Sequence, residues 1–143
     1  MKFDLTDPPW EIRKALNKVT TRSTHKRHMT GCVIVDKSGN IISNGCSHAS
    51  SFRMTELHSI HAEIHAVGRG RHIDLKGAVA IVQTKARKSG NIVSGMPCLT
   101  CAIAMESVGI NTVVYSVNNN KFSIVDLEQD ISHLKVYPKR RSK

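Results

Sequence analysis

Segments with helical periodicity alternate with segments of strand-like periodicity along this chain of 143 residues, and this alternation limits its fold. After Asp7-Pro8-Pro9, where Asp7 is the predicted N-cap, apolar residues recur at the i, i+3, i+4, i+7 spacing of an amphipathic helix. Two apolar runs on either side of residues 37–40 predict a β-hairpin. Later segments alternate in the same way, with helices expected over residues 60–67, 97–109 and, weakly, 126–135, and strands over 78–84, 110–117 and 122–127. This order predicts an α/β fold with a mixed sheet covered by helices.

The length of the chain is typical of one domain that buries its own core. We expect this domain to span residues 1–137 and to be followed by a basic tail, residues 138–143. The sequence has no apolar run of about 18 residues for a membrane span, and its first residues lack the apolar core of a secretory signal. We therefore expect a soluble cytoplasmic protein with reduced cysteines, in which Cys32 and Cys46 are buried as small apolar residues.

Basic residues outnumber acidic ones, with 21 Lys and Arg against 11 Asp and Glu and a formal net charge of +10. This excess favours a phosphorylated or polyanionic partner over a neutral metabolite. A solvated surface with no such partner could have the same composition, and part of the excess lies in the basic tail. The charge therefore bears on the class of partner and leaves the fold open.

Two short segments carry residues that could bind a metal ion. His61 and His65 in SIHAEIH share one face of a helix, but Glu63 does not follow His61 directly, as the zinc protease motif requires. In PCLTC, Cys98 and Cys101 lie three residues apart in the first turn of a helix, where the helix dipole favours thiolates. One histidine and two thiolates make three zinc ligands and leave a fourth position for water, which is typical of a catalytic site.

A closed structural site with His65 as the fourth ligand is the alternative to this open site. In the open site Glu63 is not a ligand. It lies two residues from His61, where it can handle the protons of the bound water. A third hypothesis is a non-catalytic zinc module that binds nucleic acid or protein, although such a module has no use for the Glu63 carboxylate.

The two-part pattern His61-x-Glu63 and Pro97-Cys98-x-x-Cys101 resembles the signature of the zinc-dependent cytidine and deoxycytidylate deaminase superfamily. The similarity extends over roughly residues 10–117, where the predicted elements follow the order of that family. It implies a three-layer α/β/α domain that works as a homo-oligomer and in which His61, Cys98 and Cys101 hold zinc. It also implies that Glu63 takes a proton from the zinc-bound water, delivers it to the ring nitrogen beside the attacked carbon and later protonates the departing ammonia.

The resemblance implies a substrate with an aminopyrimidine or aminopurine ring. The phrase ESVGINTVVYS is more similar to deoxycytidylate deaminases, whereas CAIAM is similar to tRNA adenosine deaminases. We predict that the substrate is deoxycytidine monophosphate (dCMP) or a related deoxycytidine phosphate. The alternative is a polynucleotide deaminase acting on cytosine or adenine in single-stranded DNA or RNA, but the chain has few aromatic side chains for stacking on bases.

Four candidate substrate contacts lie near the first part of the motif. Ser47 occupies the position at which many members of the family have an asparagine that holds the sugar. His48 and Phe52 lie in the loop before the motif, and Phe52 is the best candidate for stacking on a base. His65 lies one helical turn beyond the first ligand and either packs under the site or faces the substrate.

Two further candidates lie in the basic segment of residues 85–96, which connects the strand over 78–84 to the second part of the motif. Lys85 and Arg87 would lie near the mouth of the pocket, where they could meet a 5′-phosphate or a strand backbone. Equally, the segment could be an exposed β-hairpin whose charges favour solubility.

Overall fold

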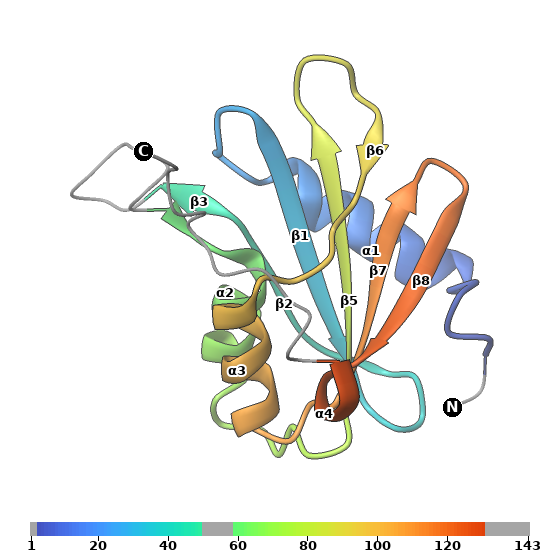
Figure 1. The fold of residues 1–143 in the computed structure, drawn as a ribbon, viewed down its shortest axis with the longest axis vertical. Helices are drawn as coiled ribbons and strands as arrows, with labels where there is room; N and C mark the ends of the chain where they lie inside the picture. Colours follow the sequence, from blue (N-terminus) through green and yellow to red (C-terminus); the bar gives the residue numbers. More distant parts are fainter. Residues whose placement is uncertain (1–2, 50–58, 131–143) are drawn as a thin grey trace.

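The computed structural model of the chain describes residues 3–49 and 59–130. Figure 1 shows a central sheet with helices on both of its faces. In chain order the elements are α1 (Trp10–Thr21), β1 (His28–Val35), β2 (Ile41–Cys46), β3 (His48–Ala49), β4 (Ser59–Ile60), α2 (Ala62–Arg69), β5 (Val79–Ala86), β6 (Ile92–Val93), α3 (Leu99–Ser107), β7 (Thr112–Asn118), β8 (Lys121–Asp126) and α4 (Leu127–Asp130).

The main sheet has six strands of mixed direction, in the order β2-β1-β5-β7-β8, with β6 paired to β5. β5 and β7 are parallel, and the other pairs in this sheet are antiparallel. A parallel pair needs a crossover connection, which here contains α3. β3 and β4 pair with each other in a separate small sheet.

Alternate residues of the strands face opposite layers of helix, as the two-residue period of a strand requires. On one face, Val33, Val35 and Ile81 form a buried cluster with Ile12 and Leu16 of α1. In Figure 1 this helix lies behind the sheet.

On the opposite face, Cys32, Ile34 and Val82 belong to a second buried cluster, which includes Ala66 of α2 and Met105 of α3. In Figure 1, α2 and α3 lie in front of the sheet. The predicted three-layer α/β/α fold with a mixed sheet is therefore confirmed.

The start of the first helix differs from the prediction. Pro9 is the N-cap, with the extended conformation φ −66° and ψ 165°, and no side chain caps the helix. Asp7 is not the N-cap, because its carboxylate instead accepts a hydrogen bond from the guanidinium of Arg13 at 2.8 Å. The same Arg13 side chain also donates to the carbonyl of Pro8 at 2.7 Å, which holds the turn in place of a cap.

The C-terminal part of the chain is described only to Asp130. The strand predicted over residues 122–127 is the edge strand β8. The rest of the helix predicted over residues 126–135 lies outside the described residues, as does the basic tail, so the proposed domain boundary stays a prediction. None of the helices within the described ranges is long and apolar enough to cross a membrane.

Close packing of α2 against β2 positions the first part of the motif. A Cβ atom on Gly45 would lie 2.8 Å from the carbonyl oxygen of Ala62 and would clash with the backbone nitrogen of Ala66, so only glycine permits this approach. The hydroxyl of Ser43 donates to the carbonyl of Ala66 at 2.7 Å. These contacts hold the first turn of α2, and with it His61, against the sheet.

Candidate metal centre and active-site pocket

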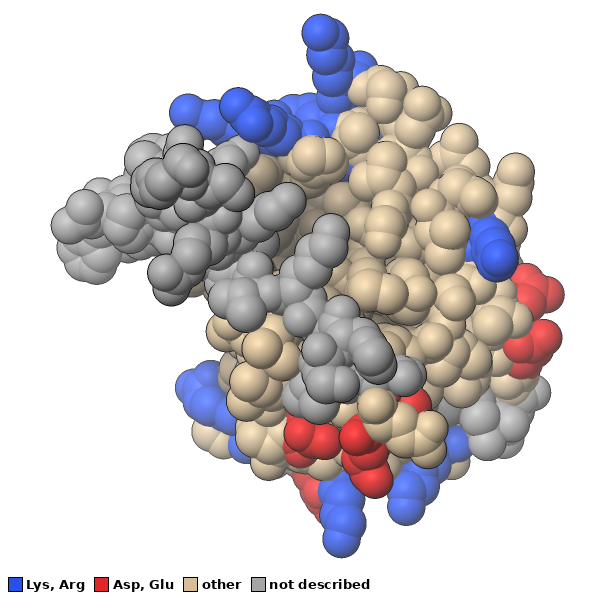
Figure 2. All heavy atoms as spheres, in the orientation of Figure 1, with Lys and Arg blue, Asp and Glu red and all other residues tan. Residues whose placement is uncertain are grey.

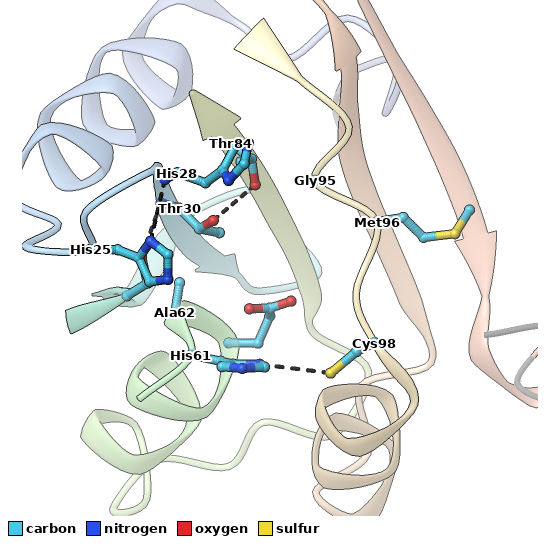
Figure 3. A pocket seen from close by; sticks show the side chains of 11 residues that line it. His25, His28, Thr30, His61, Ala62, Thr84, Gly95, Met96 and Cys98 are labelled. Carbon is cyan, nitrogen blue, oxygen red and sulfur yellow. Dashed lines mark hydrogen bonds between the residues drawn. The ribbon is translucent and has the colours of Figure 1, made fainter. Parts of the chain in front are cut away.

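His61, Cys98 and Cys101 converge between two helices. His61 is the N-cap of α2, Cys98 is the N-cap of α3, and Cys101 lies in the first turn of α3. Their ligand atoms all lie within 4.8 Å of one another. His61 Nδ1 is 3.1 Å from Cys101 Sγ and 3.7 Å from Cys98 Sγ, and Figure 3 shows the His61 ring facing Cys98. We call these three residues the zinc cluster.

The donor set and the spacing of the zinc cluster fit a zinc ion. Bond lengths of about 2.0–2.1 Å to nitrogen and 2.3 Å to sulfur place two tetrahedral ligands about 3.5 Å apart. The two nitrogen–sulfur distances lie on either side of this value. Two sulfurs and one imidazole leave one tetrahedral position for water or substrate. The N-termini of both helices also direct their partial positive charge toward the thiolates.

The protonation states within the zinc cluster suit cation binding. The hydrogen bond from Cys101 lowers the pKa of the Cys98 thiol to about 4. The same hydrogen bond, together with burial, raises the pKa of Cys101. The hydrogen bond with Cys98 raises the pKa of His61. Cys98 thus carries a thiolate charge, and a cation that binds here displaces the proton that Cys101 retains.

Glu63 lies in the first turn of α2, and its side chain is only 5% exposed. Together with His61 and Cys98 it lines a cavity of about 200 Å³. Burial raises the pKa of the Glu63 carboxyl to about 7, because the interior disfavours its charged form. A carboxyl group with this pKa can both accept and donate a proton near neutral pH.

The far end of the cavity is formed by residues that the sequence analysis did not single out. His25, His28, Thr30 and Thr84 line it from the α1–β1 loop and from strands β1 and β5 (Figure 3). His25 Nδ1 accepts the backbone N–H groups of Arg27 and His28, each at 3.3 Å. In the sequence, the available signal was a pair of histidines, His25 and His28, in a basic run directly before a buried strand.

Ser47 lines the same cavity, but its hydroxyl is engaged within the protein. The hydroxyl accepts the backbone N–H of Thr30 at 3.1 Å and lies 2.7 Å from the hydroxyl of Ser23. The Ser47 side chain is 6% exposed, so it forms part of the pocket wall. Its contact with a sugar stays a prediction.

His48 and His65 are not among the described residues that line the cavity. Their rings pack edge to face, with centroids 4.6 Å apart. His65 Nδ1 accepts the backbone N–H of Cys46 at 3.0 Å, and His48 Nδ1 donates to the carbonyl of Cys46 at 2.9 Å. The structure therefore places both histidines in a contact between α2 and the end of β2.

Lys85 and Arg87 do not line the cavity either. Lys85 is half-buried on β5, opposite Ile92 of β6, and segment 85–96 forms the β-hairpin that was one of its two interpretations. The guanidinium of Arg87 donates to the carbonyls of His25 and Ser23, at 3.0 and 2.7 Å. Arg87 thus holds the loop that carries His25. Phe52 lies outside the described residues.

Comparison with known proteins identifies relatives of this chain. A family model described as the cytidine and deoxycytidylate deaminase zinc-binding region matches residues 9–117. This match includes both parts of the motif and the elements that carry them. None of the curated proteins compared with the chain matches it significantly.

Solved structures share the fold at low sequence identity. A cytidine deaminase from Burkholderia pseudomallei aligns with a TM-score of 0.62 and 14% identity, over 81% of this chain and 90% of its own. A dCMP deaminase from the cyanophage S-TIM5, in complex with dCMP and dUMP, aligns with a TM-score of 0.55 and 20% identity, over 73% and 80% of the two chains. A diaminohydroxyphosphoribosylaminopyrimidine deaminase/5-amino-6-(5-phosphoribosylamino)uracil reductase from Thermotoga maritima aligns with a TM-score of 0.52 and 23% identity, over 72% of this chain and 27% of its own. At these identities the likeness concerns the fold alone.

Proposed function

The chain belongs to the cytidine and deoxycytidylate deaminase family, and we propose that this zinc-dependent deaminase converts a cytosine nucleotide, dCMP, to the uracil nucleotide and ammonia. A protein of the same fold, from the cyanophage S-TIM5, is a dCMP deaminase solved with dCMP and dUMP. The formal charge of +10 supports a phosphorylated substrate over a neutral nucleoside.

The observation that carries the proposal is that Glu63 lines the same cavity as His61 and Cys98. Hydrolytic deamination needs a nucleophilic water and a group that moves protons, both beside the ring carbon that bears the amine. His61, Cys98 and Cys101 would hold the zinc ion. Bound zinc supplies a Lewis acid that makes water a nucleophile near neutral pH.

Glu63 would move the protons of this reaction. Because its pKa is about 7, the carboxylate form is available to accept a proton from the attacking water. The protonated form can then donate to the ring nitrogen beside the attacked carbon and, in a second transfer, to the departing amine. One carbon–oxygen bond forms and one carbon–nitrogen bond breaks, so the products are a carbonyl and ammonia.

The size of the cavity supports a ring as the group that it encloses. Its volume of about 200 Å³ is smaller than the roughly 300–1,000 Å³ of pockets that enclose drug-sized ligands. A pyrimidine beside Glu63 would therefore leave its sugar and phosphate to extend toward His28 at the rim. Polynucleotide deamination is the second candidate. The basic residues near this rim favour it because they could contact more than one phosphate of a strand.

A substrate panel tests the proposed function. The zinc-loaded protein is incubated with deoxycytidine, dCMP, deoxycytidine triphosphate, the matching adenine compounds and short single strands. Conversion of an amine to a carbonyl raises the mass by about one unit. We expect the largest kcat/KM for dCMP. Failure to convert any cytosine compound would contradict the proposal.

Replacement of Glu63 separates the catalytic proposal from a structural zinc module. We expect Glu63→Gln to lower kcat by about 10²–10⁴-fold, the usual contribution of a positioned acid–base group, while zinc content and melting temperature are retained. A combined loss of zinc and fold in this variant would instead support the structural module.

The assembly and location of the protein are parts of the same proposal. Ile64 of α2, Ile103 of α3 and Val108, the C-cap of α3, are exposed apolar side chains, and we propose that this surface is covered in a homo-oligomer. We also propose a cytoplasmic location, since Cys98 and Cys101 are free thiols that must stay reduced to bind zinc.

A further inference from the structure

A groove lined by basic residues lies beside the active-site pocket. Its lining residues come from the α1–β1 loop and from the β5–β6 hairpin, and they are Lys26, Arg27, His28, Ala86, Arg87, Lys88 and Ser89. We call this feature the basic groove. Figure 2 shows lysine and arginine side chains gathered at the end of the molecule where, in Figure 1, β1 begins and β5 ends.

The basic groove adjoins the cavity that contains Glu63. His28 lines both the groove and the cavity, so the two are neighbours along the surface. In Figure 3, His28 lies at one end of the cavity, whereas His61 and Cys98 lie at the other. A ligand whose ring lies beside Glu63 can therefore extend past His28 into the groove.

The two segments that form the groove carry positive charge without acidic neighbours in sequence. No Asp or Glu occurs between Glu11 and Asp36, or between Asp74 and Glu106. Within the described residues, Lys26 and Lys88 are exposed and make no hydrogen bond or ion pair. Cations that no carboxylate neutralises attract anions and raise their association rates.

The groove is held in shape by hydrogen bonds that use Arg87 as a strut. The Arg87 guanidinium binds the carbonyls of Ser23 and His25, and its backbone N–H donates to the carbonyl of Arg27 at 2.9 Å. His25 Nδ1 in turn accepts the backbone N–H of Arg27. Because these bonds fix the loop to the hairpin, an anion would bind without first ordering either segment.

We propose that the basic groove binds phosphate attached to the nucleoside whose base occupies the pocket, with Lys26, Arg27 and Lys88 supplying the charge. The inference rests on the proposed function for the identity of the base. The inference goes beyond the proposed function because it assigns the phosphate site to the α1–β1 loop and the β5–β6 hairpin. The phosphate can belong to a free nucleotide or to a single strand, and binding to both sources is measured separately.

The test compares two double variants that lose the same charge. Lys26→Gln/Lys88→Gln removes the two exposed lysines of the groove. Lys37→Gln/Lys121→Gln removes two exposed lysines, one from the β1–β2 turn and one from the start of β8, and serves as the control. Calorimetry with zinc-loaded protein that also carries Glu63→Gln, both alone and combined with each double variant, measures the binding of deoxycytidine, dCMP and a five-nucleotide single strand with one cytosine, so the readout does not require turnover.

We expect the groove variant to bind dCMP about 10- to 100-fold more weakly than the protein without the lysine substitutions, because two solvent-exposed charged contacts, each worth about three- to tenfold in affinity, are lost. The control should stay within about twofold, since exposed charges distant from a ligand contribute little. If the source is a strand, the five-nucleotide ligand binds more tightly than dCMP and its affinity falls steeply with salt. If the source is a free nucleotide, dCMP binds at least as tightly as the strand.

Equal affinity for deoxycytidine, dCMP and the strand overturns the inference, as does equal weakening in the two double variants. Failure of the proposed function gives a different result. In that case phosphate-dependent binding in the groove persists, while no cytosine compound is deaminated. Deamination of deoxycytidine and dCMP with equal kcat/KM would overturn the groove assignment and leave the deaminase activity in place.

Discussion

The protein brings two sets of histidine and cysteine side chains together, and the ligand atoms of each set lie close to one another. The zinc cluster consists of His61, Cys98 and Cys101. A second cluster consists of Cys46, His48 and His65, and in both clusters these atoms lie within 4.8 Å of one another. The zinc cluster lies at the N-termini of α2 and α3, whereas the second cluster joins the end of β2 to the middle of α2. Proximity alone does not separate the two clusters.

The two clusters differ in their hydrogen bonds, and this difference shows which cluster is better suited to bind a metal ion. In the second cluster, His65 Nδ1 already accepts the backbone N–H of Cys46, so its other ring nitrogen carries the proton of the neutral imidazole. Burial raises the pKa of the Cys46 thiol, whereas hydrogen bonds lower that of Cys98 to about 4. The zinc cluster thus offers a thiolate and an imidazole nitrogen that faces it. In the second cluster no thiolate is stabilised, and the Nδ1 atoms of both His65 and His48 are already hydrogen-bonded to the backbone of Cys46, so this cluster is less prepared to bind a cation.

Alanine substitution of one cysteine in each cluster gives the largest expected difference. Cys98→Ala should reduce zinc from about one equivalent per chain to near zero, with loss of deaminase activity, because two remaining ligands hold zinc weakly. Cys46→Ala should retain zinc and lose about 1 kcal/mol of stability through a small cavity. Elemental analysis by mass spectrometry measures the metal. Loss of zinc in Cys46→Ala would contradict the distinction between the clusters.

A smaller effect is expected when the packing of α2 against β2 is disturbed, because α2 carries one histidine of each cluster. Gly45→Ala should cost about 1–3 kcal/mol of unfolding free energy, because its Cβ would meet the backbone of Ala62 and Ala66. Movement of α2 should also weaken zinc affinity by about tenfold, as changes to residues that support metal ligands do. Gly68→Ala is the matched control, since nothing lies within 4 Å of its added Cβ, and it should stabilise the helix by about 0.5–1 kcal/mol. Urea unfolding and competition with a chelator measure these changes. An equal effect of the two substitutions would show that the approach of α2 to β2 does not depend on Gly45.

The smallest expected effect concerns the protonation of the second cluster. Burial, His48 and Arg69 all lower the pKa of His65 below its usual 6.5, so the folded protein binds a proton there less readily than the unfolded chain. Stability should therefore fall as pH decreases through about 6.5, and this loss should level off below the folded pKa. His65→Gln removes the titrating group, so its stability cost relative to the native protein should shrink between pH 7.5 and pH 5.5. Urea unfolding of both proteins at each pH checks this sign, and a cost that grows toward pH 5.5 would contradict it.

The resemblance carried by a few residues was sufficient to predict the family and the zinc cluster. The residue types and their spacing are typical of a catalytic metal site and uncommon elsewhere; the residues are His61, Glu63, Cys98 and Cys101. The strand and helix positions followed from periodicity, because burial of one face imposes a period of two on strands and 3.6 on helices. The N-cap of α1 was not predictable in the same way, since the Arg13 guanidinium that binds Asp7 competes with the helix for that carboxylate.

The substrate end of the pocket could not be predicted from sequence to the same extent. His25 and His28 come from a polar run with no periodicity, and their place beside Glu63 depends on the pairing of β1 with β5 and on the Arg87 strut. Arg87 itself was predicted to meet a phosphate because it is basic and lies near the motif. That contact stays a prediction, and the guanidinium also holds the α1–β1 loop, which a charge pattern cannot indicate.

The sequence by itself determined the α/β class, the metal donors and the carboxylate beside them, because these depend on residue type and on spacing along one segment. Tertiary structure decided how those donors are hydrogen-bonded and charged, and which basic residues border the pocket. The physical reason is that hydrogen bonds and burial determine whether a ring nitrogen has a free lone pair, whether a cysteine is a thiolate and whether a charge is neutralised. These hydrogen bonds and this burial arise only when segments distant in the chain pack together.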